Sequence, residues 1–121
     1  MAKQSKDARR RRGANRLTMK IKRLKNIKIN CYDFKINWTK EHGGGDFSYK
    51  TMTINIGTKD ASDSEIFMIL CHELMEIVAT EMNVRLCRPD CYTDFIFVYD
   101  HRQHETMMNM FSGLISQFIK G

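Results

Sequence analysis

The sequence predicts a single α+β domain, in which a small antiparallel meander of strands packs on two helices. Three observations support this fold class. Apolar and polar residues alternate over much of residues 27–57, which is the period of half-buried strands. Apolar residues at helical spacing then occur twice, over residues 59–82 and 101–119. At 121 residues, the chain is long enough for one modest core, and no linker divides its folded part.

The first part of the domain is expected to consist of strands. Alternation over residues 27–31 continues in a shifted phase over residues 34–38, which predicts two strands joined by a tight turn or bulge at residues 32–33. Three consecutive glycines at 43–45 predict a loop, because their backbone entropy disfavours regular structure. The alternation over residues 51–56, ended by a glycine, predicts another half-buried strand.

The second part is expected to hold two helices around a short strand. Ser62 and Glu65 form a capping-box pattern at the start of the first helix. Its apolar stripe at helical spacing consists of Ile66, Leu70, Leu74, Ile77 and Val78. Residues 95–99 predict a short strand that is apolar on both faces, and the final helix is expected to run from His101 to about residue 119.

The positive charge of the chain is concentrated at its N-terminus. Residues 1–28 hold twelve Lys/Arg and one acid, for a net charge of +11, whereas residues 29–121 have a net charge of −5. Because residues 1–16 lack apolar periodicity, we expect them to form a disordered basic arm before a domain of residues 17–121. The arm, with Arg9, Arg10, Arg11 and Arg12 at its centre, suits sequence-independent binding of nucleic acid through the first 28 residues. A solubilising tail is the alternative.

The composition favours a cytoplasmic protein. No apolar run approaches the ~20 residues of a membrane helix. The basic N-terminus is not followed by the hydrophobic stretch of a secretory signal. Four cysteines without such a signal are expected to be reduced thiols in a cytoplasm.

The first predicted helix carries the segment His72-Glu73-Leu74-Met75-Glu76. Residues four apart project from the same face of a helix, so His72 and Glu76 can bind one metal ion together. Imidazole and carboxylate are both zinc ligands. Glu73 is rotated by about 100° from His72, beside such an ion, where a carboxylate can take a proton from water. The segment therefore predicts one zinc ion with Glu73 as a general base.

A catalytic zinc needs a third protein ligand and an open position. The histidines outside the first helix are His42, His101 and His104. His42 adjoins the glycine loop, which is a mobile place for a ligand. We expect His101 to be the third ligand, because it stands at the fixed end of a predicted strand. His104, on the expected inward row of the final helix, is its substitute or a fourth ligand.

Two alternatives use the same residues. The pattern His-Glu-x-x-Glu is short, and helices also carry it by chance on a solvated face. A second zinc site is also conceivable, since Cys87, Cys91, His101 and His104 follow the order of a Cys₂His₂ finger. The spacings between and within these pairs fall short of the usual ones.

The order of these features resembles the zincin metallopeptidase superfamily, particularly the very small variants carried by bacteria and their phages. The resemblance covers residues 27–119: a strand pair, a glycine loop, the strand TINIG, the His-Glu helix and a histidine that opens a final helix. His72 and Glu73 match the superfamily motif, whereas Glu76 stands where its second histidine is found.

The resemblance implies a minimal zinc-dependent peptidase in the cytoplasm of a bacterial cell or a phage-infected host. Its substrate would be a peptide or protein, with Glu73 as the base that activates water. The resemblance also implies that the strand before the helix borders the cleft, so that Thr53, Ile54 and Asn55 would pair with an extended substrate. The alternative function is a catalytically inactive metal-binding or interaction protein that docks on nucleic acid through its basic arm.

Overall fold

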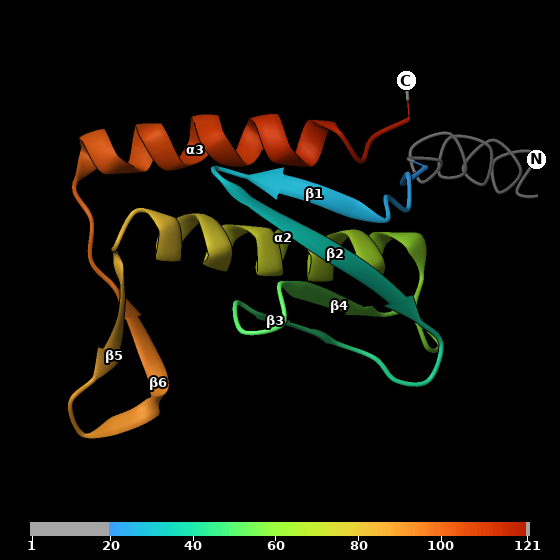
Figure 1. The fold of residues 1–121 in the computed structure, drawn as a ribbon, viewed down its shortest axis with the longest axis horizontal. Coiled ribbons are helices and arrows are strands. Elements are labelled where there is room, and N and C mark those ends of the chain that lie inside the picture. The colour runs from blue at the N-terminus through green and yellow to red at the C-terminus, as the bar shows by residue number, and fades with distance from the viewer. Residues whose placement is uncertain (1–19, 121) are drawn as a thin grey trace, which may run out of the picture.

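The computed structural model describes residues 20–120, which form a four-stranded sheet, two helices and a separate hairpin (Figure 1). The strands are β1 (Asn26–Ile29), β2 (Tyr32–Thr39), β3 (Gly45–Ser48), β4 (Thr53–Gly57), β5 (Arg85–Arg88) and β6 (Cys91–Phe97). The helices are α2 (Asp63–Glu81) and α3 (His101–Ser116). The predicted α+β class is therefore confirmed. The predicted arm, residues 1–16 with Arg9, Arg10, Arg11 and Arg12 at its centre, lies outside the described residues.

The sheet has the strand order β1-β2-β4-β3 and is mixed. β1 pairs with β2 and β3 pairs with β4 in antiparallel fashion, but β2 and β4 are parallel. The expectation of a purely antiparallel meander is thus wrong at one pairing. β4 contains the fully buried Ile54 and Ile56, and this strand takes the inner position that its burial favours. β3 consequently forms the edge of the sheet.

Two local features of the strand region differ from the prediction. The turn between β1 and β2 lies at Asn30–Cys31 rather than at residues 32–33, because Asn30 adopts the left-handed φ of 55° that a tight turn needs. The glycine loop also contributes to the sheet, since β3 begins at Gly45.

The glycine loop packs directly on the end of β4. The Gly57 N–H donates a hydrogen bond to the Gly44 carbonyl (2.6 Å). A Cβ at Gly57 would lie 2.4 Å from the His42 carbonyl oxygen and 2.6 Å from the Gly43 carbonyl carbon. Gly44 itself has a φ of 73°, which side chains disfavour. The backbone path therefore requires glycine at Gly44 and Gly57.

Helix α2 packs on the sheet, and α3 lies alongside α2 (Figure 1). The start of α2 is as predicted, because Ser62 accepts a hydrogen bond from the Glu65 N–H and the capping box is complete. All five residues of the predicted apolar stripe are buried in the core. From the last helix, Met107, Leu114 and Ile115 join that core. Within residues 20–120, neither helix has both the length and the apolar character needed to cross a membrane.

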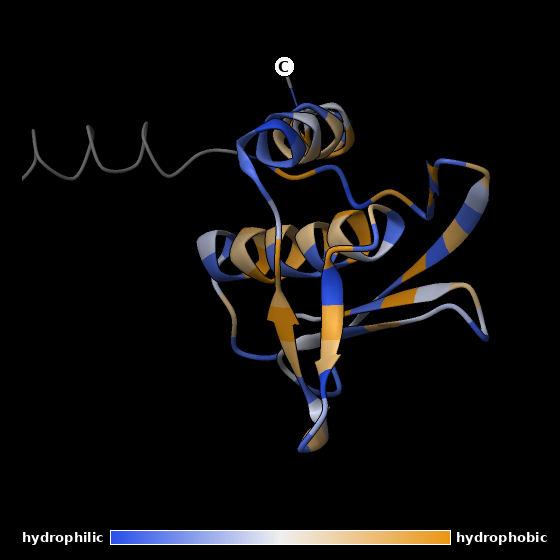
Figure 2. Cartoon of the chain, turned by 90° about the vertical axis from the view of Figure 1, so that its left-hand side faces the viewer, coloured by the Kyte–Doolittle hydropathy of each residue, from blue (hydrophilic) through white to orange (hydrophobic). Residues whose placement is uncertain are grey.

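Strands β5 and β6 form a two-stranded hairpin that projects from the body between α2 and α3 (Figure 1). Hydrophobic residues occupy the middle of β5 and the last part of β6 (Figure 2). The exposed apolar side chains on or next to it are Leu86, Ile96, Phe97, Val98 and Tyr99. Because isolated hairpins are marginally stable, contacts at the base of this hairpin must hold it on the body.

Candidate metal centre

One turn of α2 brings three possible metal ligands together. Ligand atoms of His72, Glu73 and Glu76 all lie within 4.8 Å of one another. The His72 Nε2 and Glu76 Oε2 atoms are 3.3 Å apart. Two atoms that share a tetrahedral zinc at bond lengths of about 2.0–2.2 Å stand roughly 3.4 Å apart. The group could therefore bind a metal ion with little movement of either side chain.

Glu73 differs from its two neighbours in its environment. It is 4% exposed and is the one charged residue that is buried among the described residues, whereas the His72 side chain is 67% exposed. Burial raises the pKa of the Glu73 carboxyl, and the negative charge of Glu76 raises it further. A carboxylate that binds protons more readily is better suited to general-base chemistry near neutral pH.

The close approach of β3 to α2 explains this burial. A Cβ at Gly45 would lie 2.8 Å from Ile69 Cγ2 and 3.2 Å from Glu73 Cγ. Only a glycine lets the edge strand come this near the helix without displacing those side chains. Gly45 thus places the start of β3 over the base of the Glu73 side chain.

Two depressions meet at the possible ligands, and Glu73 lines only the smaller of them. A cleft of about 290 Å³ is lined by residues of β3 and α2 together with Arg85. A larger apolar groove of about 540 Å³ lies between α2, the hairpin and α3. Its main apolar residues are Met68, Cys71, Met75, Phe97, Tyr99 and Met107. His72 and Glu76 line both depressions, so the candidate metal centre stands where the two meet.

His101 and His104 do not belong to this group. The His101 side chain is 85% exposed and its Nε2 lies 3.6 Å from Glu105 Oε1. The exposed His104 ring stacks on Tyr99, with 5.9 Å between the ring centroids. Both histidines lie in the first turn of α3, before its first buried residue Met107. The expectation that His104 faces inward is therefore wrong, and the third ligand expected from these histidines is not in place.

The alternative Cys₂His₂ site is not assembled. Cys87 and Cys91 are exposed, free cysteines on the hairpin. In the part of the chain that the structure describes, the one group of three or more possible ligands is that of His72, Glu73 and Glu76.

The residues expected to pair with substrate occupy an inner strand. Thr53, Ile54 and Asn55 belong to β4, which has β2 on one side and β3 on the other. Asn55 accepts a hydrogen bond from Asn37 (2.9 Å) and donates one to Asp46 (2.7 Å). The expectation that these residues pair with substrate is therefore wrong, because β4 already pairs with β2 on one side and with β3 on the other. Among the described strands, the outer one beside the candidate metal centre is β3.

Arg85 is a residue of the cleft that the sequence did not reveal. Its Nε lies 3.8 Å from Glu76 Oε1, and its guanidinium lies over the rings of Phe47 and Phe95. No local pattern marks it, because it meets α2 only through the fold of the hairpin. The lead available in the sequence was a positive charge only four residues after the end of α2.

No protein-family model, no curated protein and no solved structure matches this chain. Its function is therefore inferred from the chemistry of the cleft itself.

Proposed function

We propose that this chain is a minimal zinc-dependent peptidase of the zincin type. One observation carries the proposal: a buried carboxylate, Glu73, adjoins an imidazole and a second carboxylate spaced like a pair of metal ligands. His72 and Glu76 would provide two of the three protein ligands that a catalytic zinc needs, and Glu73 would serve as the base. A bound cation would also provide the opposite charge that a buried carboxylate needs.

The chemistry divides between the ion and the protein. Zinc at this position would act as a Lewis acid on the scissile carbonyl. Glu73 takes a proton from the attacking water as the new carbon–oxygen bond forms. It then gives that proton to the amine nitrogen as the carbon–nitrogen bond breaks, so that water is consumed and Glu73 is regenerated.

The surroundings of the centre suit an extended polypeptide. On its outer side, β3 pairs with no other strand of residues 20–120, and a peptide can add there as a further strand. The apolar groove lies on the other side of His72 and Glu76 and has the size and character of a pocket for a large apolar side chain. We therefore propose that β3, rather than β4, pairs with the substrate.

The metal centre is tested by zinc binding. We expect the unmodified protein to bind one zinc ion per chain, and His72→Ala to weaken that affinity by more than about 100-fold, beyond the loss typical of an outer-sphere partner. His101→Ala is the matched control, because this histidine is 85% exposed and lies outside the group. Titration calorimetry and metal analysis measure both. A protein without zinc affinity, or equal losses in the two variants, would contradict the proposed centre.

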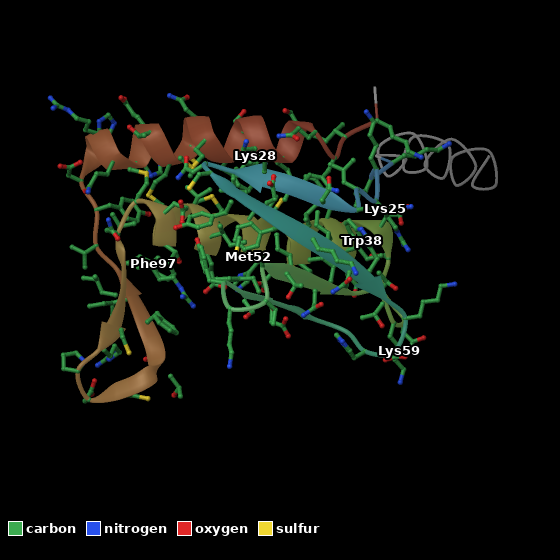
Figure 3. All side chains as sticks on the ribbon, viewed as in Figure 1. Lys25, Lys28, Trp38, Met52, Lys59 and Phe97 are labelled. Atoms are coloured by element: carbon green, nitrogen blue, oxygen red, sulfur yellow. The ribbon has the colours of Figure 1, made fainter. Side chains whose placement is uncertain are left out.

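A second candidate function is a catalytically inactive, zincin-like binding protein that docks on nucleic acid. It is favoured by the cationic segment formed by Lys20, Lys22, Arg23, Lys25 and Lys28, all exposed. No ion pair joins these five to another described residue. Lys25 lies toward the end of the molecule opposite Phe97 and the hairpin (Figure 3). Nucleic acid bound there would leave the cleft accessible.

Deletion of residues 1–16, which carry seven Lys/Arg, tests this binding function. We expect affinity for duplex DNA to fall, and the slope of log affinity against log salt to drop by up to about six, at ~0.9 for each phosphate contact. Fluorescence anisotropy at several salt concentrations gives both quantities. Unchanged affinity and slope would rule out the arm as a nucleic-acid contact.

A further inference from the structure

We infer that Arg85 is a positioning residue that holds the Glu76 carboxylate in place for metal binding. The inference rests on the proposed metal centre and adds to it a residue from outside the motif helix. Arg85 is the one arginine or lysine among the residues that line the cleft. It is the first residue of β5, so the hairpin brings it to the helix.

Two aromatic rings from separate sheets hold the guanidinium. Its Cζ lies 3.7 Å from the ring centroid of Phe95 on β6 and 5.3 Å from that of Phe47 on β3. The Arg85 side chain is only 18% exposed. Stacking on rings restricts the planar guanidinium to few orientations, and the ring faces attract its positive charge. An arginine held in this way can fix the position of whatever carboxylate it faces.

That carboxylate is Glu76, whose two oxygens face different partners. Oε2 lies 3.3 Å from His72 Nε2, and Oε1 lies 3.8 Å from Arg85 Nε. The second distance exceeds a hydrogen bond, and the buried Arg85 Nε has no hydrogen-bond partner among the described residues. A movement of roughly 1 Å would bring Oε1 within hydrogen-bond range of this donor. Glu76 would then present Oε2 to the metal while Arg85 binds Oε1.

Such an arrangement has a general physical rationale. Carboxylates that bind metals are themselves usually hydrogen-bonded, and loss of the outer partner typically lowers metal affinity by about 10- to 100-fold. A purely structural role is the competing explanation, because Arg85 also joins the hairpin to β3 through the two rings. The two roles differ in whether the effect of Arg85 depends on the Glu76 carboxylate.

The test measures zinc affinity by calorimetry in full-length protein, so it does not require catalytic activity. Arg85→Met keeps the apolar stem and removes the charge and the donors. We expect it to weaken zinc binding by about 10- to 100-fold. Arg88→Met is the matched control on the same strand, since Arg88 pairs with Asp90 and Asp94 rather than with the cleft, and we expect no change. Arg85→Lys keeps the positive charge and is expected to lose less affinity than Arg85→Met.

A double-mutant cycle separates positioning from structure. In a Glu76→Gln background, Arg85→Met is expected to change zinc affinity by less than about twofold, because the interacting carboxylate is already gone. Equal losses in both backgrounds, or no loss in either, would overturn the inference. If Arg85→Met fails to fold by circular dichroism, the comparison moves to Arg85→Lys, whose loss must again vanish in the Glu76→Gln background. Absence of zinc binding in the unmodified protein would instead refute the metal centre itself.

Discussion

Glu73→Gln is expected to lower the rate of peptide hydrolysis by about 10²- to 10⁴-fold, the usual contribution of a general base, while zinc binding is retained. Glutamine has nearly the same shape as glutamate but cannot take a proton from water. Turnover of a fluorogenic peptide that contains large apolar residues, together with zinc stoichiometry, measures the two effects. Glu105→Gln, on the exposed face of α3, is the control and should retain full activity.

The stability of the Glu73→Gln variant provides a second check. Because burial raises the pKa of Glu73 in the folded protein, the native state binds this proton more tightly than the unfolded state does. The contribution of this group to stability therefore increases as the pH falls and decreases as the pH rises through the raised pKa. Near neutral pH, a neutral glutamine removes the free-energy cost of burying an ionised carboxylate. The metal-free variant should therefore unfold at no lower temperature than the unmodified protein.

Three results would contradict this assignment of Glu73. Full activity in Glu73→Gln would show that another group acts as the base. Loss of zinc in the same variant would make Glu73 a metal ligand, which its place within 4.8 Å of the other two donors allows. A marked fall in thermal stability would mean that the loss of activity reflects unfolding.

Gly57→Ala is expected to lower the free energy of unfolding by about 3 kcal/mol, at the upper end of the overpacking range. The added Cβ would lie 2.4 Å from the His42 carbonyl oxygen, and main-chain atoms cannot move aside as the tip of a side chain can. The glycine loop would have to lift off the end of β4. Because the same loop leads into β3, zinc affinity should fall as well.

The matched control is Gly43→Ala in the same loop, where a Cβ would meet nothing within 4 Å. We expect this variant to change stability by less than about 0.5 kcal/mol, as surface substitutions usually do. Urea unfolding followed by circular dichroism compares the two. Similar stabilities for Gly57→Ala and Gly43→Ala would mean that the loop does not pack on β4 as described.

Much of α2 could be predicted from the sequence, because its determinants are local. The capping box at Ser62 and the apolar stripe both depend on residues within a few positions of each other. The common face of His72 and Glu76 follows from helical geometry alone. The α+β class followed in the same way, from the change of hydrophobic period along the chain.

The order of the strands could not be predicted with equal success. The chain pairs β3 with β4 in a hairpin and β4 with β2 in parallel. An antiparallel meander would show the same alternation of apolar and polar residues in the sequence. Periodicity reports which face of a strand is buried, but not which strand lies beside it. The periodicity therefore could not test what the resemblance implied, that Thr53, Ile54 and Asn55 pair with substrate, and the outer strand at that place is β3.

The sequence by itself determined the motif helix and the three donors on one of its turns, since residues four apart on a helix are neighbours in any fold. Only the tertiary structure decided what surrounds them. It buried Glu73 under β3, brought Arg85 to Glu76 from the hairpin, and left His101 on an exposed turn of α3. These placements depend on packing between segments that are distant in the chain, and no local sequence pattern indicates that packing.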